Sequence, residues 1–406
     1  MRHAPYIELL GRLDENGPEW RPTVAGLAVL RFVDWRLEHE DLRTAADWDA
    51  VETIRRALLE LADGNPVRAA LLSVLERASG ANVNRIEVAQ SLMRCGRALN
   101  LSGRWALAVD VFETVDSIVE AGLNPSLVVQ ANISRGAALR RLGNWDASAD
   151  AYAHAAHIAH AAADTAGVLQ VEVGRANTHI ARGNLPAAES LLESVVEEAR
   201  AQGFGTVLGM ALHSRCTVAH QRGFFADAVR LGYDALEAST DATSGDAILA
   251  DIAAAFAGMR MYEAARDSYL IVAVTSQSQW VRWQATLNLL ELAAIDGQEQ
   301  AFDDYARQLE SAALDARLRA YYLLFLGIGQ ETFGRIDKAK ISLASAREFS
   351  AQNQLHQIEY DALIASAELE SRRFAPAQHS VNRSAETVPE CVLEIAAALG
   401  ERAKLQ

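Results

Sequence analysis

The chain has 406 residues, 50% of them hydrophobic, and a formal net charge of -15. This length is too great for one ordinary globular core, and the acidity disfavours general binding to nucleic acids or anionic membranes. The three cysteines include no C-x-x-C pair, which argues against a disulfide framework or a zinc site and favours a reducing cytoplasm. No apolar run has the length of a signal-peptide core or a bilayer span, so we expect a cytoplasmic protein without membrane insertion.

Residues 1–80 predict three helices that form an N-terminal cap. The first begins at Pro22-Thr23 and is apolar around much of its girth. The second is capped by Asp47, and the third runs from Val67 to the helix-ending Gly80. An alternative for part of this cap is a degenerate repeat around Trp48. The stripe of the second helix has amphipathic spacing and consists of Val51, Ile54, Leu58 and Leu61.

One short pattern then occurs eight times: a small or bent residue, an apolar or aromatic residue two positions on, and Ala three further on. The spacings between copies are 40, 40, 40, 37, 37, 37 and 38 residues, and such a period is typical of helical repeat arrays. Gly143-Asn144, for example, separates predicted helices at 129–142 and 146–161, because Gly tolerates the left-handed conformation that ends a helix. The copies start at Gly103, Gly143, Gly183, Gly223, Arg260, Gly297, Gly334 and Arg372.

Two features near the end of the chain interrupt or close the array. The segment Asp241–Gly245 is the most loop-like interruption, and the period shortens there. Residues 389–404 carry an apolar stripe and predict a C-terminal capping helix within 387–406. The stripe consists of Val392, Ile395, Ala396 and Leu399.

The pattern resembles the tetratricopeptide repeat over residues 82–386. A small residue stands at the eighth position of the units, at Gly96, Gly136, Ala176, Cys216, Ala253 and Gly327. A large residue stands at the seventeenth, at Trp105, Trp145, Phe225, Tyr262 and Phe374, and an aromatic at the twenty-fourth, at Phe112, Tyr152 and Tyr269. The units are longer than the consensus of about 34 residues, lack its closing proline, and are similar to the repeats of bacterial regulatory and peptide-sensing solenoids. The unit with Glu299 and Phe302 departs furthest from the pattern.

This resemblance implies the fold class: all-α, a right-handed α-solenoid of about eight helix-turn-helix repeats with helical N- and C-terminal caps. The expected organisation is a cap at 1–80, a solenoid at 81–386 and a capping helix at 387–406.

The resemblance also implies that the first helix of each unit lines a concave groove. In the N-terminal half this face is neutral to basic, with Gln90, Arg94, Arg97, Gln130, Arg140, Arg141, Asn177, His213, Thr217 and His220. In the C-terminal half it is acidic and more apolar, with Gln284, Asn288, Glu291, Tyr321, Phe325, Glu331, Glu359 and Glu370. We expect a partner or peptide to contact Arg94, Arg97, Gln130, Arg140, Arg141, Asn177, His213 and His220, the alternative being that these residues only solvate an open face.

Other chemistry has weaker support. The histidines at 154, 157 and 160 form a helical stripe without an accompanying carboxylate or Cys at ligand spacing, so we expect a surface stripe rather than a metal site. The aromatic run 321–325 is interpreted as core and groove floor rather than a partner patch. Cys216 lies near His213 and His220, but its small-residue position favours a buried thiol. The common phosphate-binding, zinc-protease and hydrolase motifs are absent, so we expect no catalytic residue, metal or cofactor.

The leading hypothesis is a non-enzymatic scaffold or regulator that holds another protein or an extended peptide in its groove. One alternative is a peptide-sensing regulatory solenoid that switches a partner when a ligand binds. A more remote alternative is an enzyme on a helical scaffold. The sequence contains no signal for the oligomeric state or the identity of the partner.

Overall fold

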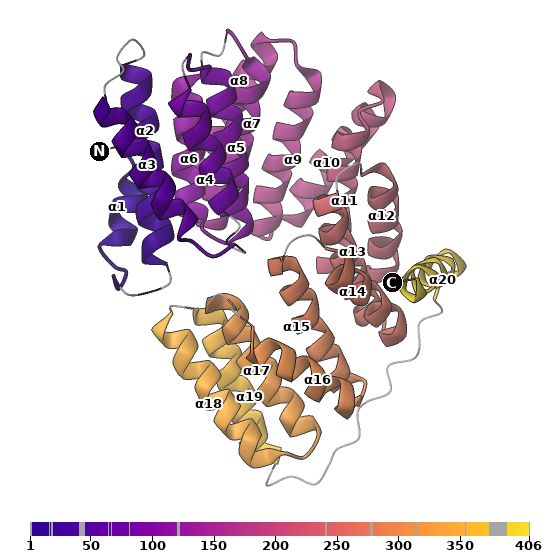
Figure 1. The fold of residues 1–406 in the computed structure, drawn as a ribbon. Coiled ribbons are helices and arrows are strands. Elements are labelled where there is room, and N and C mark those ends of the chain that lie inside the picture. The colour runs from indigo at the N-terminus through magenta and orange to yellow at the C-terminus, as the bar shows by residue number, and fades with distance from the viewer. Residues whose placement is uncertain are drawn as a thin grey trace. The chain divides into compact units, whose positions relative to one another are not determined.

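The computed structural model describes residues 2–15, 17, 19–39, 45–63, 65, 67–80, 82–119, 122–239, 242–276, 279–312, 314, 316–353, 355–372 and 388–405. These residues form twenty α-helices and no strand, which confirms the all-α fold class (Figure 1). The chain divides into two compact units, Met1–Val207 (unit 1) and Leu208–Gln406 (unit 2), with the boundary inside one helix. Within the described ranges, no helix is both long and apolar enough to cross a membrane.

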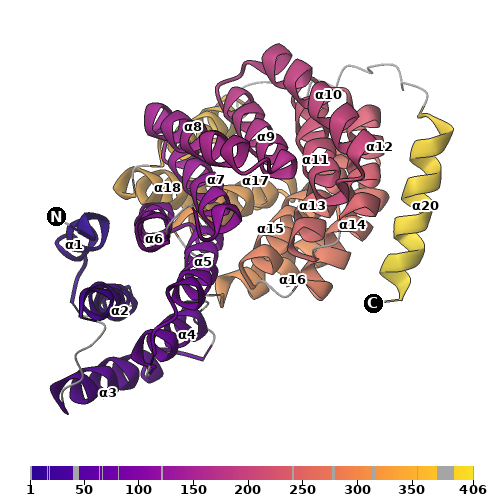
Figure 2. The same ribbon diagram turned by 90° about the horizontal axis from the view of Figure 1, so that it is seen from above.

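Unit 1 begins with four helices, and three of them, α2 to α4, correspond to the helices predicted for the first 80 residues. The short helix α1 was not predicted. Three helix pairs follow, in which α7 also packs on its first-helix neighbours α5 and α9 (Figure 2). The helices are α1 (Ala4–Leu10), α2 (Trp20–Glu38), α3 (Ala45–Leu59), α4 (Arg68–Ser79), α5 (Arg85–Leu101), α6 (Trp105–Ile118), α7 (Pro125–Arg141), α8 (Trp145–Ala161), α9 (Thr165–Ala181) and α10 (Leu185–Gln202).

Unit 2 continues the alternation of first and second helices from α11, which carries the boundary between the units. The prediction of a loop-like interruption at 241–245 is wrong for residues 242–245, because these residues form the first turn of α13. The eighth copy of the pattern lies outside the described residues beyond Arg372. The helices are α11 (Gly205–Gln221), α12 (Phe225–Ala238), α13 (Ala242–Gly258), α14 (Tyr262–Thr275), α15 (Gln279–Ile295), α16 (Glu299–Glu310), α17 (Ala316–Thr332), α18 (Ile336–Gln352), α19 (His356–Arg372) and α20 (Glu390–Lys404).

Seven of the predicted pattern starts form the turns between paired helices. All seven have left-handed backbone, with φ between 71° and 79° at the six glycines and 61° at Arg260. Only glycine adopts this conformation without a steric cost from Cβ, which explains why the pattern begins with it. Arg260 adopts the same turn with a side chain and therefore carries local strain.

Aromatic side chains of second helices pack against glycines of first helices. Tyr152 on α8 fills the space between Gly136 on α7 and Gly174 on α9, where added Cβ atoms would lie 2.9 Å and 2.3 Å from its ring. Phe302 on α16 fills the corresponding space beside Gly329 on α17, with only 2.1 Å to an added Cβ. The bulky Phe302 therefore replaces the Ala of the pattern because its neighbour has no side chain.

The last helix, α20, does not continue the stack from α19. It packs against α14 and α12 instead, within unit 2 (Figure 2). Its stripe residues Val392, Ile395 and Leu399 are at most 8% exposed. Gly400 allows a close approach to α14, since a Cβ there would lie 3.3 Å from an Asp267 carboxylate oxygen.

Candidate functional site

The eight residues predicted to contact a partner are divided between the two units. Six lie on the first helices α5, α7 and α9 of unit 1, and His213 and His220 lie on α11 in unit 2. We call the side of these helices that carries the predicted residues the first-helix face, and describe it for each unit separately.

Three glutamines one repeat apart form a row on the first helices of unit 1. Gln130 on α7 donates its side-chain amide to the Gln170 oxygen on α9, and Gln90 is the equivalent residue on α5. Gln90 is exposed, whereas Gln130 and Gln170 are half-buried. A primary amide offers two donors and an acceptor, so this glutamine row (Gln90, Gln130, Gln170) has capacity beyond its one internal bond. The sequence analysis missed Gln170, although its distance of one period from Gln130 is a usable signal.

The arginines on α5 differ in how firmly they are held. Arg94 donates to the hydroxyls of Ser91, at 2.8 Å, and Ser73, at 3.1 Å, while its residue as a whole stays exposed. Arg97, one turn further along the helix, is also exposed. Because both hydroxyl partners are neutral, the positive charge of Arg94 is oriented but not neutralised by these contacts.

The arginines on α7 contact aromatic side chains of unit 1. Burial raises the pKa of Tyr152, and the charge and hydrogen bond of Arg140, together with the charge of Arg141, act in the opposite direction. The Arg141 guanidinium also lies 5.9 Å from the centre of the Trp105 ring. Arg140 and Arg141 therefore take part in the packing of unit 1. The other predicted residue of this face, Asn177 on α9, is half-buried.

In unit 2, a histidine and a threonine of α11 share one carboxylate of α13. His213 Nε2 lies 2.9 Å and Thr217 Oγ1 3.4 Å from the same oxygen of Asp251. His220, in contrast, packs its ring edge against Phe225 at 5.4 Å, at the start of α12. The structure thus places His213 and Thr217 in a polar cluster and His220 in the packing between paired helices.

A carboxyl group one repeat further on, Glu291 of α15, is half-buried. Burial raises the pKa of Glu291. Burial also raises the pKa of Tyr269 on α14, and the charges of Glu291 and Asp251 add to this rise. The charges of both carboxylates therefore act on Tyr269, which was predicted only as a packing aromatic.

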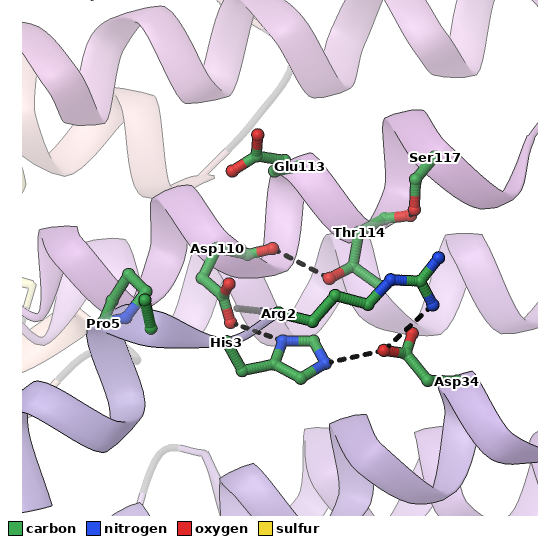
Figure 3. A pocket seen from close by; sticks show the side chains of 9 residues that line it. Arg2, His3, Pro5, Asp34, Asp110, Glu113, Thr114 and Ser117 are labelled. Carbon is green, nitrogen blue, oxygen red and sulfur yellow. Dashed lines mark hydrogen bonds and ion pairs between the residues drawn. The ribbon is translucent and has the colours of Figure 1, made fainter.

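A cavity of about 390 Å³ near the start of the chain was not predicted. Its lining combines the N-terminal arm (Arg2 and His3) and the first residues of α1 with α2 and α6 (Figure 3). His3, only 4% exposed, lies between two carboxylates, with Nδ1 2.8 Å from Asp110 and Nε2 3.2 Å from Asp34. Ionised carboxylates only accept hydrogen bonds, so both ring nitrogens must donate and the imidazole is positively charged.

The electrostatics of His3 agree with this geometry. Burial lowers the pKa of His3, but the hydrogen bonds and charges of Asp110 and Asp34 outweigh it and the net pKa is raised. Asp34 also pairs with Arg2 at 3.2 Å, and Glu113 pairs with Arg135 at 3.3 Å. Each carboxylate that lines the cavity therefore has a basic partner from this chain, and the arrangement clamps the N-terminal arm onto α2 and α6.

The structure also shows the surroundings of the histidines and the cysteine that were considered for metal binding and thiol chemistry. His154 lies 3.5 Å from Asp116, and no group of three His, Cys, Asp or Glu among the described residues could hold a metal ion. Cys216 is fully buried, and desolvation, with the charge of Asp251, raises its pKa to about 12. A thiol in this state is a packing residue and a poor nucleophile.

Comparison with known proteins finds similar chains only among solved structures. None of the known family models matches the chain, and no curated protein does so. NprR in complex with its cognate peptide NprX is 13% identical, with a TM-score of 0.49, over 85% of this chain and 92% of NprR. A Rap protein complexed with competence and sporulation factor is 12% identical, with a TM-score of 0.46, over 86% and 98% of the two chains. The apo form of the quorum sensor NprR from B. thuringiensis is 13% identical, with a TM-score of 0.42, over 90% and 92%. At these identities the similarities assign no site residue to this chain.

Proposed function

We propose that this protein is a non-enzymatic binding module that holds an extended peptide, or an extended segment of another protein, on the first-helix face of unit 1. The glutamine row is the observation that carries this proposal. Its members repeat with the helices, so the same amide chemistry recurs at each step along the face. Peptide backbone presents N–H and C=O groups in every sequence, and primary amides complement both.

The basic residues of α5 extend this surface. Arg94 is oriented by its two serine partners, and Arg97 is exposed beside it. A guanidinium held in place loses less side-chain entropy on binding than a free one and forms charge-assisted bonds with carboxylates. We therefore propose that a carboxylate of the guest, either a side chain or a C-terminus, contacts α5.

The experiment is selection of peptides from a random library on the full chain, followed by fluorescence anisotropy with a selected peptide. Gln130→Ala combined with Gln170→Ala should weaken binding by about 1–3 kcal/mol, or roughly 5- to 150-fold, because about two hydrogen bonds to the guest are lost. The matched control is Gln202→Ala, which removes an exposed amide from the second helix α10. Unchanged affinity in the double variant, or failure to select any peptide, contradicts the proposal.

One contact supports the alternative in which a bound peptide switches the protein between two states. The amides of Gln130 and Gln170 bond to each other across α7 and α9 in the absence of a guest. A guest backbone that binds these groups competes with that bond, and this competition links occupancy to the approach of neighbouring repeats. Small-angle scattering with and without a selected peptide tests this, and identical scattering profiles would contradict switching.

A further inference from the structure

The N-terminal arm and α1 are held on unit 1 by few buried groups. Tyr6 is the buried residue of α1, and its ring lies over Gly26 of α2, where an added Cβ would be 2.8 Å away. The other apolar side chains of α1 are only partly buried against the core. A helix of seven residues is not stable by itself in water, because too few hydrogen bonds offset the entropy of nucleation. The position of α1 therefore depends on its anchors, and His3 is the charged one.

The backbone of His3 is strained and connects its side chain to α1. His3 has left-handed backbone, with φ 59° and ψ 34°, a conformation that is uncommon for a residue with a side chain and costs free energy. Its carbonyl oxygen accepts the first hydrogen bond of α1, from the N–H of Ile7 at 3.3 Å. Such strain persists only while other contacts offset it. Loss of the side-chain contacts of His3 would therefore free its backbone and loosen the first turn of α1.

The side-chain contacts of His3 require the imidazolium form. Both ring nitrogens donate, Nδ1 to Asp110 and Nε2 to Asp34 (Figure 3). A neutral imidazole has one donor and one acceptor, so one nitrogen would present a lone pair to a carboxylate. Arg2 also pairs with the Asp34 oxygen that His3 contacts, whereas the basic partner of Asp110, which is 7% exposed, is His3. Deprotonation of His3 thus turns one of two attractive contacts into a repulsive one.

The charges around His3 determine the pH range in which this happens. Burial lowers the pKa of His3, but the hydrogen bonds and charges of the two aspartates outweigh it, so the group titrates above its ordinary value of 6.5. Beyond them, Arg2 pairs with Glu38, and Arg135 of α7 pairs with Glu113. The charged and titratable groups on the elements next to the arm are Arg2 in the arm, Tyr6 on α1, Asp34 and Glu38 on α2, and Asp110 and Glu113 on α6.

We propose that His3 is the latch of a pH-controlled opening, in which the arm and α1 detach from α2 and α6 when the imidazole loses its proton. The rest of unit 1 stays folded, because α6 keeps its packing on α5 and α7. Detachment removes one wall of the cavity of about 390 Å³ and uncovers the carboxylates of Asp34, Asp110 and Glu113. This inference is independent of peptide binding, since the first-helix face carries none of these residues.

The experiment is hydrogen exchange of the full chain between pH 6 and 9, followed by mass spectrometry of peptides from α1 and α7 and corrected for the intrinsic effect of pH on exchange. Protection of α1 should fall roughly 10- to 150-fold as the pH rises through the pKa of His3, the range expected for loss of a hydrogen bond between charged groups. Protection of α7 should stay constant. An NMR titration of the His3 ring carbon Cε1 gives the pH midpoint with which the change in α1 should coincide.

Two variants provide the controls. His3→Lys keeps a positive charge throughout this pH range, so protection of α1 should no longer depend on pH. His157→Gln removes an exposed imidazole from α8 and should leave the wild-type profile unchanged. The inference is overturned if protection of wild-type α1 is constant with pH, if its midpoint differs from that of the His3 titration, or if α7 loses protection together with α1. The wild-type profile and the His3 titration decide the question even if His3→Lys does not fold.

Discussion

Replacement of Gly329 by alanine should destabilise unit 2, against the usual effect of this change in a helix. Alanine normally stabilises a helix interior by about 1 kcal/mol relative to glycine. Here the new Cβ would lie 2.1, 2.5 and 2.9 Å from three atoms of the fully buried Phe302 ring. The ring or α17 must move, and overpacking of this kind costs about 1–3 kcal/mol. Contacts this short place the cost near the upper limit, so we expect a net loss of about 2 kcal/mol.

The assay is urea unfolding followed by circular dichroism, with hydrogen exchange in α16 and α17 to locate the effect, since two units need not unfold together. Gly245→Ala is the control: its Cβ would lie 3.5 Å from Leu236, an ordinary contact, and the helical residue should become slightly more stable. Phe302→Leu should relieve the clash, so that the double variant is more stable than the sum of the single effects predicts. A stabilising Gly329→Ala, or strictly additive single effects, would refute the packing argument.

Three shorter predictions concern other parts of the structure. His3 has a raised pKa in the folded protein, so the stability that its charge contributes is complete below about pH 6.5 and is lost as the pH rises through that raised pKa. The thermal midpoints of the wild type and His3→Gln should therefore differ most at low pH and converge in alkali. A difference that stays constant with pH would contradict the charged clamp. Maleimide at pH 8 should modify the exposed Cys391 and spare the buried Cys95 and Cys216, whose pKa values are raised to about 12. Peptide mass spectrometry measures the labelling, and equal labelling of all three thiols would refute the burial of Cys95 and Cys216. Leu399→Asp places a charge where α20 meets α12 and α14, so hydrogen exchange should accelerate in α20 while exchange in α17 and α18 stays unchanged. Unaltered exchange in α20 would argue against the packing of α20 on α12 and α14.

The repeat period made much of the array predictable. A left-handed turn favours Gly, and a helix crossing favours a small residue, so local chemistry marks both in most units. The same period could have identified Gln170 from Gln130, but only the structure shows that the two side chains meet.

The contacts of His3 with Asp110 and Asp34 could not be predicted from the repeat pattern. His3 and Asp110 are separated by 107 residues, and α1 is too short to show a helical period. No local pattern connects residues that belong to different repeats and to no shared register. The final helix was predictable for a related but partial reason: an amphipathic stripe defines which side of α20 is buried, but not which surface buries it.

The attachment of α20 to α12 and α14 determines where anything joined to the C-terminus would be held. A fluorophore or a fused domain placed after Lys404 would start near the beginning of α14, since the charges of Asp267 and Glu263 act on the Lys404 ammonium. Proximity labelling from that end would therefore report on the neighbours of α14 rather than on those of α19.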